Sequence, residues 1–157
     1  MNDVEKRRYL SISIKMFAEF DESNFPIVKV CLTGKPNSEE EFNNFLSKWL
    51  ELYDNKKDFT FIFNTEKVSN PPLKYSLKMS IFIKELRKRD YQYLQKSIIL
   101  INDKKIKWML DFIFLIQPPV APVYIYDIKY GLSNELDELI KKVILNPETD
   151  FIKPKKS

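Results

Sequence analysis

The chain contains no histidine among its 157 residues, and it has only two glycines and one cysteine. Without histidine, Ser-His and Cys-His nucleophile pairs, histidine general bases and histidine metal sites cannot be built. Two glycines, Gly34 and Gly131, are too few for a Walker loop or a dinucleotide-binding fingerprint. The lone Cys31 allows neither an internal disulfide nor a thiolate zinc site. We therefore expect a protein that is not an enzyme and that uses no metal or other cofactor.

The sequence also lacks signals for secretion or membrane insertion. The N-terminus is polar and charged, without the apolar region and cleavage site of a signal peptide. The most apolar stretch, from Trp108 to Tyr126, is broken by Asp111, Gln117 and three prolines, so it cannot form one membrane-spanning helix. Cys31 lies in the alternating run IVKVCL, where a buried and inert thiol is typical. We expect a soluble, intracellular and cytoplasmic protein.

Apolar periodicity predicts strands that alternate with helices. Strands are expected at residues 9–20, 27–34, 59–63, 97–101 and 123–126. Helices are expected within 36–58, after a cap at Asn37 or Ser38, and at 73–90, 104–116 and 131–145. The order β-β-α-β-α-β-α-β-α predicts one α/β domain over residues 1–150, followed by a basic tail over 151–157. Right-handed crossovers give a mainly parallel sheet covered by helices, with the first strand or two antiparallel at an edge.

The element order, together with the passage from FTFIFNTEKVSNPPLKYS to PVAPVYIYD, resembles the STAS domain of bacterial anti-sigma-factor antagonists and sulfate transporters. The resemblance implies a non-enzymatic regulatory module that binds a protein partner. The family's regulatory serine stands in an Asp-x-Ser-Gly-type motif at the start of the helix after the third strand. Here Asn64 occupies the strand-end position and no Ser-Gly pair follows, so Ser69 and Ser76 are the nearby serines.

A second passage, YLQKSIILINDKKIKWMLDFIFLIQPP, resembles the CRAL-TRIO domain, which implies an apolar ligand such as a lipid. The composition is rich in residues with AT-rich codons, and the pattern is similar to that of proteins from AT-rich protists and their large DNA viruses. A lipid-binding protein and a virion-associated or nuclear protein of such a virus are therefore the alternative functions.

Ligands of open parallel sheets bind at the carboxyl ends of the strands. That edge brings together the loops at residues 64–75, 102–105 and 127–130, and helix N-termini there can hold an anion. Ser69 or Asn70 could instead cap the following helix, with Pro71 and Pro72 starting it. The candidate ligand or regulatory residues at this edge are Thr65, Ser69, Asn70, Lys74, Tyr75 and Asn102.

The helix predicted over residues 104–116 is apolar on almost every side, with Asp111 its only polar residue after Lys107. Such a helix is either central in the core or part of an interface. A homodimer, a protein partner or an apolar ligand could cover what the core does not. The candidate interface residues are Trp108, Met109, Phe112, Ile113, Phe114 and Ile116.

Basic residues cluster before and within that helix, more densely than the net charge of +4 suggests. Such a patch could bind nucleic acid, an acidic protein or an anionic lipid surface. The alternative is a solvated face without a ligand, since no RNA-binding aromatic motif accompanies it. The residues of the predicted patch are Arg87, Lys88, Arg89, Lys104, Lys105 and Lys107.

Overall fold

The computed structural model describes residues 17–128 and 151–152, and these form a sheet with three helices. The predicted helix over residues 131–145 lies outside the described residues. The elements are β1 (Ala18–Asn24), β2 (Ile27–Leu32), α2 (Glu39–Asp54), β3 (Phe59–Asn64), α3 (Leu73–Arg87), β4 (Leu94–Ile101), α4 (Lys104–Ile116), β5 (Val123–Asp127) and β6 (Phe151–Ile152).

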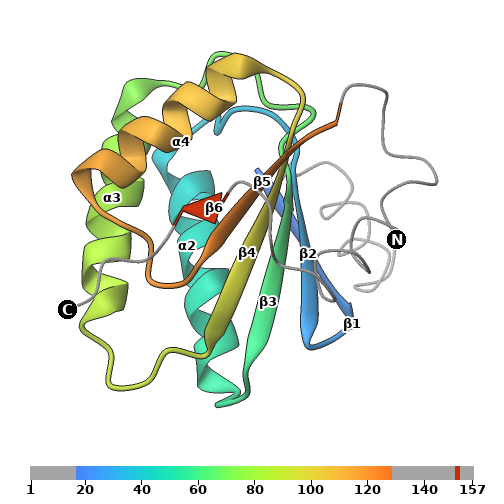
Figure 1. Cartoon of the computed structure of the whole chain (residues 1–157), viewed down its shortest axis with the longest axis vertical. Coiled ribbons are helices and arrows are strands. Elements are labelled where there is room, and N and C mark those ends of the chain that lie inside the picture. The colour runs from blue at the N-terminus through green and yellow to red at the C-terminus, as the bar shows by residue number, and fades with distance from the viewer. Residues whose placement is uncertain (1–16, 129–150, 153–157) are drawn as a thin grey trace, which may run out of the picture.

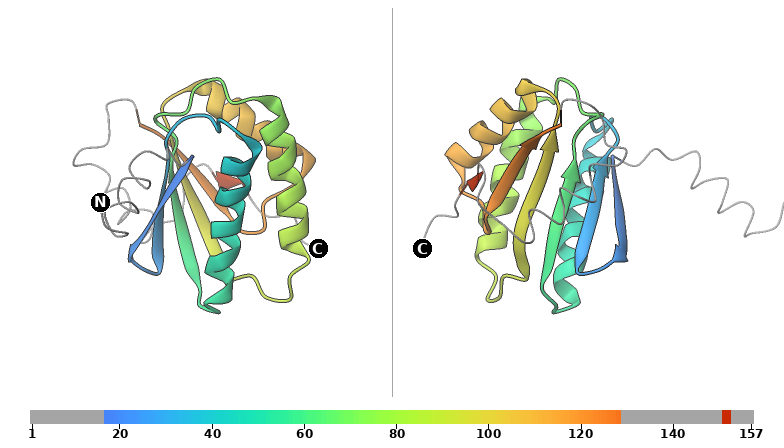
Figure 2. Two further views of the ribbon diagram at one scale, coloured as in Figure 1. Left: turned by 180° about the vertical axis from the view of Figure 1, so that it is seen from behind. Right: turned by 45° about the vertical axis from the view of Figure 1, so that its right-hand side comes forward.

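The six strands lie side by side in sequence order, β1 to β6. Strands β2 to β5 are parallel, while β1 and β6 pair antiparallel at the two edges. Because successive right-handed crossovers move in one direction, they place every connecting helix on the same face. Figures 1 and 2 show α2, α3 and α4 together on one side of the sheet. The expected α/β class and mainly parallel sheet are confirmed.

Two segments differ from the prediction. Strand β1 continues to Asn24, although residues 21–26 were expected to be a loop, and its register with β2 shifts between Asp21 and Asn24. Its side chains are mostly exposed after Phe20 because β1 is an edge strand, so polar residues are tolerated there. Phe151 and Ile152, assigned to the tail by the sequence, instead pair with β5.

Helix α2 begins at a side-chain cap. The Glu41 backbone N–H donates to the Ser38 hydroxyl at 3.2 Å, and three glutamates occupy the first turn, where they complement the helix dipole. The sequence left Asn37 or Ser38 as the cap, and the structure selects Ser38. One side of α2 then buries an apolar row against the sheet: Phe42, Phe45, Trp49, Leu52 and Tyr53.

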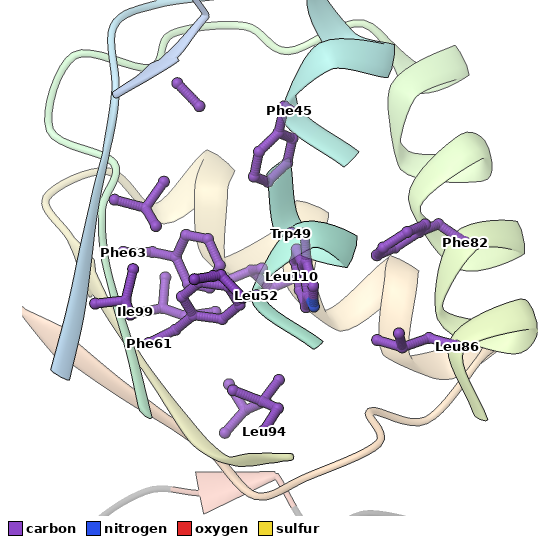
Figure 3. Close-up of a cluster of buried hydrophobic side chains, with 14 of the residues drawn as sticks. Phe45, Trp49, Leu52, Phe61, Phe63, Phe82, Leu86, Leu94, Ile99 and Leu110 are labelled. Atoms are coloured by element: carbon purple, nitrogen blue, oxygen red, sulfur yellow. The ribbon is translucent and has the colours of Figure 1, made fainter. Parts of the chain in front are cut away.

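Aromatic rings dominate the core between the sheet and the helices (Figure 3). The ring of Trp49 meets that of Phe61 edge-on, with centroids 4.8 Å apart, and meets that of Phe82 on α3 at 5.2 Å. Edge-to-face pairs of this kind add about 0.5–1.5 kcal/mol beyond the burial of their area. These contacts hold α2 and α3 at fixed positions over β3.

The opposite face of the sheet carries a second apolar cluster. Each of its central members is less than a tenth exposed, although α2, α3 and α4 all cover the other face. Strands that are apolar on both faces are typical of the middle of a parallel sheet. The members are Ile62, Ile98, Leu100, Tyr124 and Ile128.

Candidate functional site

Helix α3 has a row of apolar side chains on the side turned away from the core. Leu73, Leu77 and Ile81 are four residues apart, so they lie along one side of the helix, and Ile81 is 62% exposed. The buried side of the same helix carries Tyr75 and Phe82. Helix α3 is therefore apolar on two sides, of which the sheet and its neighbours cover only one.

Helix α4 has a similar exposed row. Trp108 is 67% exposed and Leu115 is 82% exposed, and Ile116 beside them is half-exposed. The buried side of α4 consists of Ile106 and two further residues at helical spacing, Leu110 and Ile113. The helix is thus not buried all round, which leaves its outer side available to a partner.

Helices α3 and α4 lie side by side on the same face of the sheet (Figure 1), and each has an exposed apolar row outside the core. The Ser80 hydroxyl of α3 donates to the Ile113 carbonyl oxygen of α4 at 3.4 Å. The small side chains of Ser76 and Ser80 on α3 are both buried. At the end where both helices begin, the Lys105 ammonium donates to the Asn70 side-chain oxygen at 3.1 Å. We call the two exposed rows together the outer apolar face. It consists of Leu73, Leu77, Ile81, Trp108, Leu115 and Ile116.

The structure divides the predicted interface residues into two groups. Trp108 and Ile116 belong to the outer apolar face, and Phe112 is partly exposed. Ile113 is buried, whereas Met109 and Phe114 are partly buried against the core. The sequence prediction missed Leu115 and the whole row on α3. The four-residue spacing of that row was the signal that could have identified it.

The predicted residues at the carboxyl edge of the sheet also divide. Thr65 is buried, and its hydroxyl donates to the Leu100 carbonyl oxygen at 2.8 Å, which joins the ends of β3 and β4. Tyr75 is buried against Phe42, with ring centroids 4.9 Å apart. Both side chains are therefore packed inside the domain and are not exposed at the edge.

The other four residues at this edge are exposed: Ser69, Asn70, Lys74 and Asn102. Asn70 has a left-handed backbone with φ of 44° and contacts Lys105 instead of capping α3. The N-cap of α3 is Pro72, which makes no side-chain cap hydrogen bond. Of the two serines considered for regulation, Ser69 is exposed, whereas Ser76 is buried inside α3.

The predicted basic patch does not form one surface. Arg87 ends α3 next to the start of β4, whereas Lys104 begins α4 directly after the end of β4. The eight residues of β4 separate the two groups by roughly 26 Å, because a strand rises about 3.3 Å per residue. Residues 87–89 therefore lie at the amino end of the sheet, and the lysines of α4 lie at the carboxyl end.

Several of these cations already have partners within the domain. The Arg87 guanidinium donates to the carbonyl oxygens of Pro118 and Pro119 at 2.8 and 3.0 Å, and so ties the end of α3 to the loop after α4. Lys88 pairs with Glu85, Lys107 pairs with Asp111, and Arg89 lies over the ring of Tyr53. A nucleic acid would thus meet two small, partly neutralised groups of cations.

Electrostatic perturbation is concentrated at one buried phenol. Burial raises the pKa of Tyr53 to about 12, because the charged phenolate is disfavoured away from water. Its hydroxyl donates to the Gln92 side-chain oxygen at 2.9 Å. At the surface, the hydrogen bond from Lys78 lowers the pKa of Glu39. Neither group lies on the outer apolar face.

A cavity of about 140 Å³ lies between the sheet and the helices. Across residues 17–128, no group of three or more Asp, Glu, Cys or His side chains is arranged so that it could hold a metal ion. No helix in the described part of the chain is long and apolar enough to cross a membrane.

The sequence matches no protein-family model, no curated protein and no solved structure.

Proposed function

We propose that the chain is a non-enzymatic regulatory or structural module with a STAS-like fold, which associates with a second copy of itself through the outer apolar face. The described elements run β-β-α-β-α-β-α-β-β, and the first eight match the order β-β-α-β-α-β-α-β-α on which the resemblance to the STAS domain rested. The observation that carries the proposal is the gathering of six large apolar side chains on the outer side of two adjacent helices.

The size of the outer apolar face fits a protein interface. Its six side chains are between 44% and 82% exposed, so together they present apolar surface on the order of a few hundred Å². The largest apolar patch on a typical monomer is about 300–600 Å², and a standard interface buries about 800 Å² on each partner. The face is thus large enough to be the apolar centre of an interface with a polar rim.

The charges around the face favour a second copy as the partner. Lys84, Glu85 and Lys88 flank the row on α3, while Lys107 and Asp111 flank the row on α4. The Lys88–Glu85 and Lys107–Asp111 pairs form within the protomer, so a twofold axis can bring two copies of the rim together with little like-charge repulsion. A rim of one sign would oppose such contact.

The proposal is tested by measuring the mass of the protein in solution over a wide concentration range. We expect sedimentation equilibrium to show a shift from the 18.8 kDa protomer toward a dimer. Trp108→Asp and Ile81→Asp each place a charge in the face, and each should weaken the dimer by roughly 30-fold or more, the usual cost of losing a central interface residue.

The matched control is Ser47→Asp, which adds the same charge to the exposed side of α2. It should leave the dimer unchanged. Circular dichroism melts of all variants, recorded at concentrations where the protein is monomeric, separate loss of association from loss of folding. A wild-type protein that stays monomeric up to millimolar concentration would overturn the proposal, as would equal weakening by Ser47→Asp.

A further inference from the structure

The cavity of about 140 Å³ is lined by all three helices and by four strands. Trp49 contributes from α2, Met79 from α3, Ile113 from α4 and Val123 from β5. Figure 3 shows how Trp49 and its neighbours face the sheet across this part of the core. Apart from Lys35 at its edge and a few hydroxyls, the wall is apolar, so it offers a water molecule few hydrogen-bond partners.

The lining of the cavity runs from Leu94 and Ala121, near the amino end of the sheet, to the carboxyl edge. Its lining there comes from the loop between β2 and α2, with Gly34, Lys35 and Pro36, and from the loop between β3 and α3. Lys35 is exposed, and a Cβ added to Gly34 would meet no atom within 4 Å, so there is open space at this point. A polar depression lined by Thr33, Lys35, Asn37 and Glu41 adjoins this part of the lining.

We infer that this cavity binds an apolar group of roughly six to eight non-hydrogen atoms, either a free molecule or the tail of an amphiphile whose polar end lies beside Lys35. The size follows from the volume, because a dry cavity of about 150 Å³ in another protein takes up benzene. An empty cavity leaves its wall atoms without dispersion partners, which an apolar occupant restores.

The same volume sets an upper limit on the ligand. A tail longer than the cavity must leave its additional methylenes in the mouth or in water, where they gain little. The inference therefore differs from the lipid-carrier alternative, which needs space for a complete long chain. It is also independent of the proposed dimer, because the cavity lies on the inner side of α3 and α4 and the outer apolar face lies on the other side.

Trp49 provides a specific reporter. The chain has two tryptophans, so Trp108→Phe leaves Trp49 in the cavity wall as the sole indole fluorophore. This variant is titrated with the sodium alkanoates from butanoate to decanoate and, separately, with toluene. We expect a saturable change in Trp49 fluorescence whose affinity rises roughly fourfold for each added methylene. The rise should stop when the tail reaches about six to eight carbons.

Substitutions that fill the cavity locate the site. Ala121→Leu and Val123→Phe both enlarge wall residues and should weaken the binding of octanoate and toluene at least tenfold, while the thermal melts stay cooperative. Two different variants are used so that one misfolded protein does not decide the result. Ile81→Phe, which enlarges an exposed side chain outside the cavity, is the matched control and should bind as before.

Lys35→Met distinguishes the two sources of the apolar group. If the natural ligand is an anionic amphiphile, this variant should bind octanoate severalfold more weakly and bind toluene with unchanged affinity. If Lys35→Met and its parent bind octanoate equally, the natural ligand is a free apolar molecule.

The inference is overturned if neither probe binds to the folded protein, if affinity continues to rise through decanoate, or if the two cavity-filling variants bind as tightly as the parent.

Discussion

Helix α2 and the pair formed by α3 and α4 pack against the same face of the sheet, yet they differ on their outer sides. The outer side of α2 is polar, with Asn43, Asn44, Ser47 and Glu51 exposed. The outer sides of α3 and α4 carry every exposed large aliphatic side chain of the described residues. Covering one face of a sheet requires only one apolar side per helix, so the additional apolar side of α3 and α4 needs a different explanation.

The comparison is sharpest within α4 itself, where one apolar residue is fully buried and another is 82% exposed. Ile106→Ala removes a side chain with no exposed surface, and we expect it to lower the free energy of unfolding by about 2–5 kcal/mol. Leu115→Ala on the opposite side should change it by less than about 0.5 kcal/mol. Urea denaturation of the monomer, followed by circular dichroism, measures both.

Equal losses for Ile106→Ala and Leu115→Ala would mean that both sides of α4 are buried within the protomer. The outer apolar face would then not exist as a free surface. Conversely, a loss for Leu115→Ala that appears only at dimer-forming concentrations would assign the stabilisation of that side chain to the second copy.

The sequence predicted α4 with the bounds that the structure shows, and it could not predict which side of α4 faces outward. Periodicity identifies a buried side only when polar residues mark the other side, and between Trp108 and Ile116 only Asp111 is polar. On α3, the buried positions 76 and 80 hold serines and not larger apolar residues. Their burial depends on the close approach of α4. Helix proximity is a tertiary property and leaves little trace in a single sequence.

The basic residues show a second limit. Arg87 and Lys104 are close enough in the sequence to suggest one patch, but the intervening β4 carries the chain from one end of the sheet to the other. Strand β1 shows a third, because the polar run after Phe20 reads as a loop when the exposure of an edge strand is unknown. In each case, knowledge of strand order was the missing information.

The buried side of α2 carries a tyrosine, Tyr53, whose titration reports on its burial. The pKa of Tyr53 is raised from 10.0 to about 12, so the folded state holds its phenolic proton more tightly than the unfolded state. Stability from this group is complete below pH 10 and is lost as the pH rises toward 12, by roughly 1.4 kcal/mol for each unit. Denaturation midpoints measured between pH 9 and pH 12 should show the loss.

Tyr53→Phe should remove this part of the alkaline loss. It should also cost about 1 kcal/mol at neutral pH, because the hydrogen bond to Gln92 disappears. Tyr91→Phe is the matched control, since Tyr91 is largely exposed and its replacement should change stability at neutral pH by less than about 0.5 kcal/mol. A Tyr53→Phe profile identical to that of the parent protein would contradict the burial of the phenol.

The smallest expected effects concern the starts of the helices. Ser38 caps α2, and the Asp103 carboxylate accepts from the Lys105 backbone N–H at 2.9 Å to cap α4. Ser38→Ala and Asp103→Ala should each lower the free energy of unfolding by about 1 kcal/mol. Thermal denaturation of the monomer should show losses of unfolding free energy that agree to within a few tenths of a kcal/mol. Asp103→Ala can lose slightly more, because it also removes a negative charge at the helix N-terminus.

Helix α3 has no side-chain cap, so the sequence alternative that Ser69 caps it can be tested in the same series. Ser69→Ala should change stability by less than about 0.5 kcal/mol, and a loss as large as that of Ser38→Ala would mean that Ser69 is the cap after all.

Without a cap, the start of α3 depends on the contact of Tyr75 with Phe42. We therefore expect the amides of the first turn, next to Leu73, to exchange with solvent faster than those of α2 and α4. The end of the outer apolar face at Leu73 would then become ordered when the second copy binds, which amide exchange of monomer and dimer can measure.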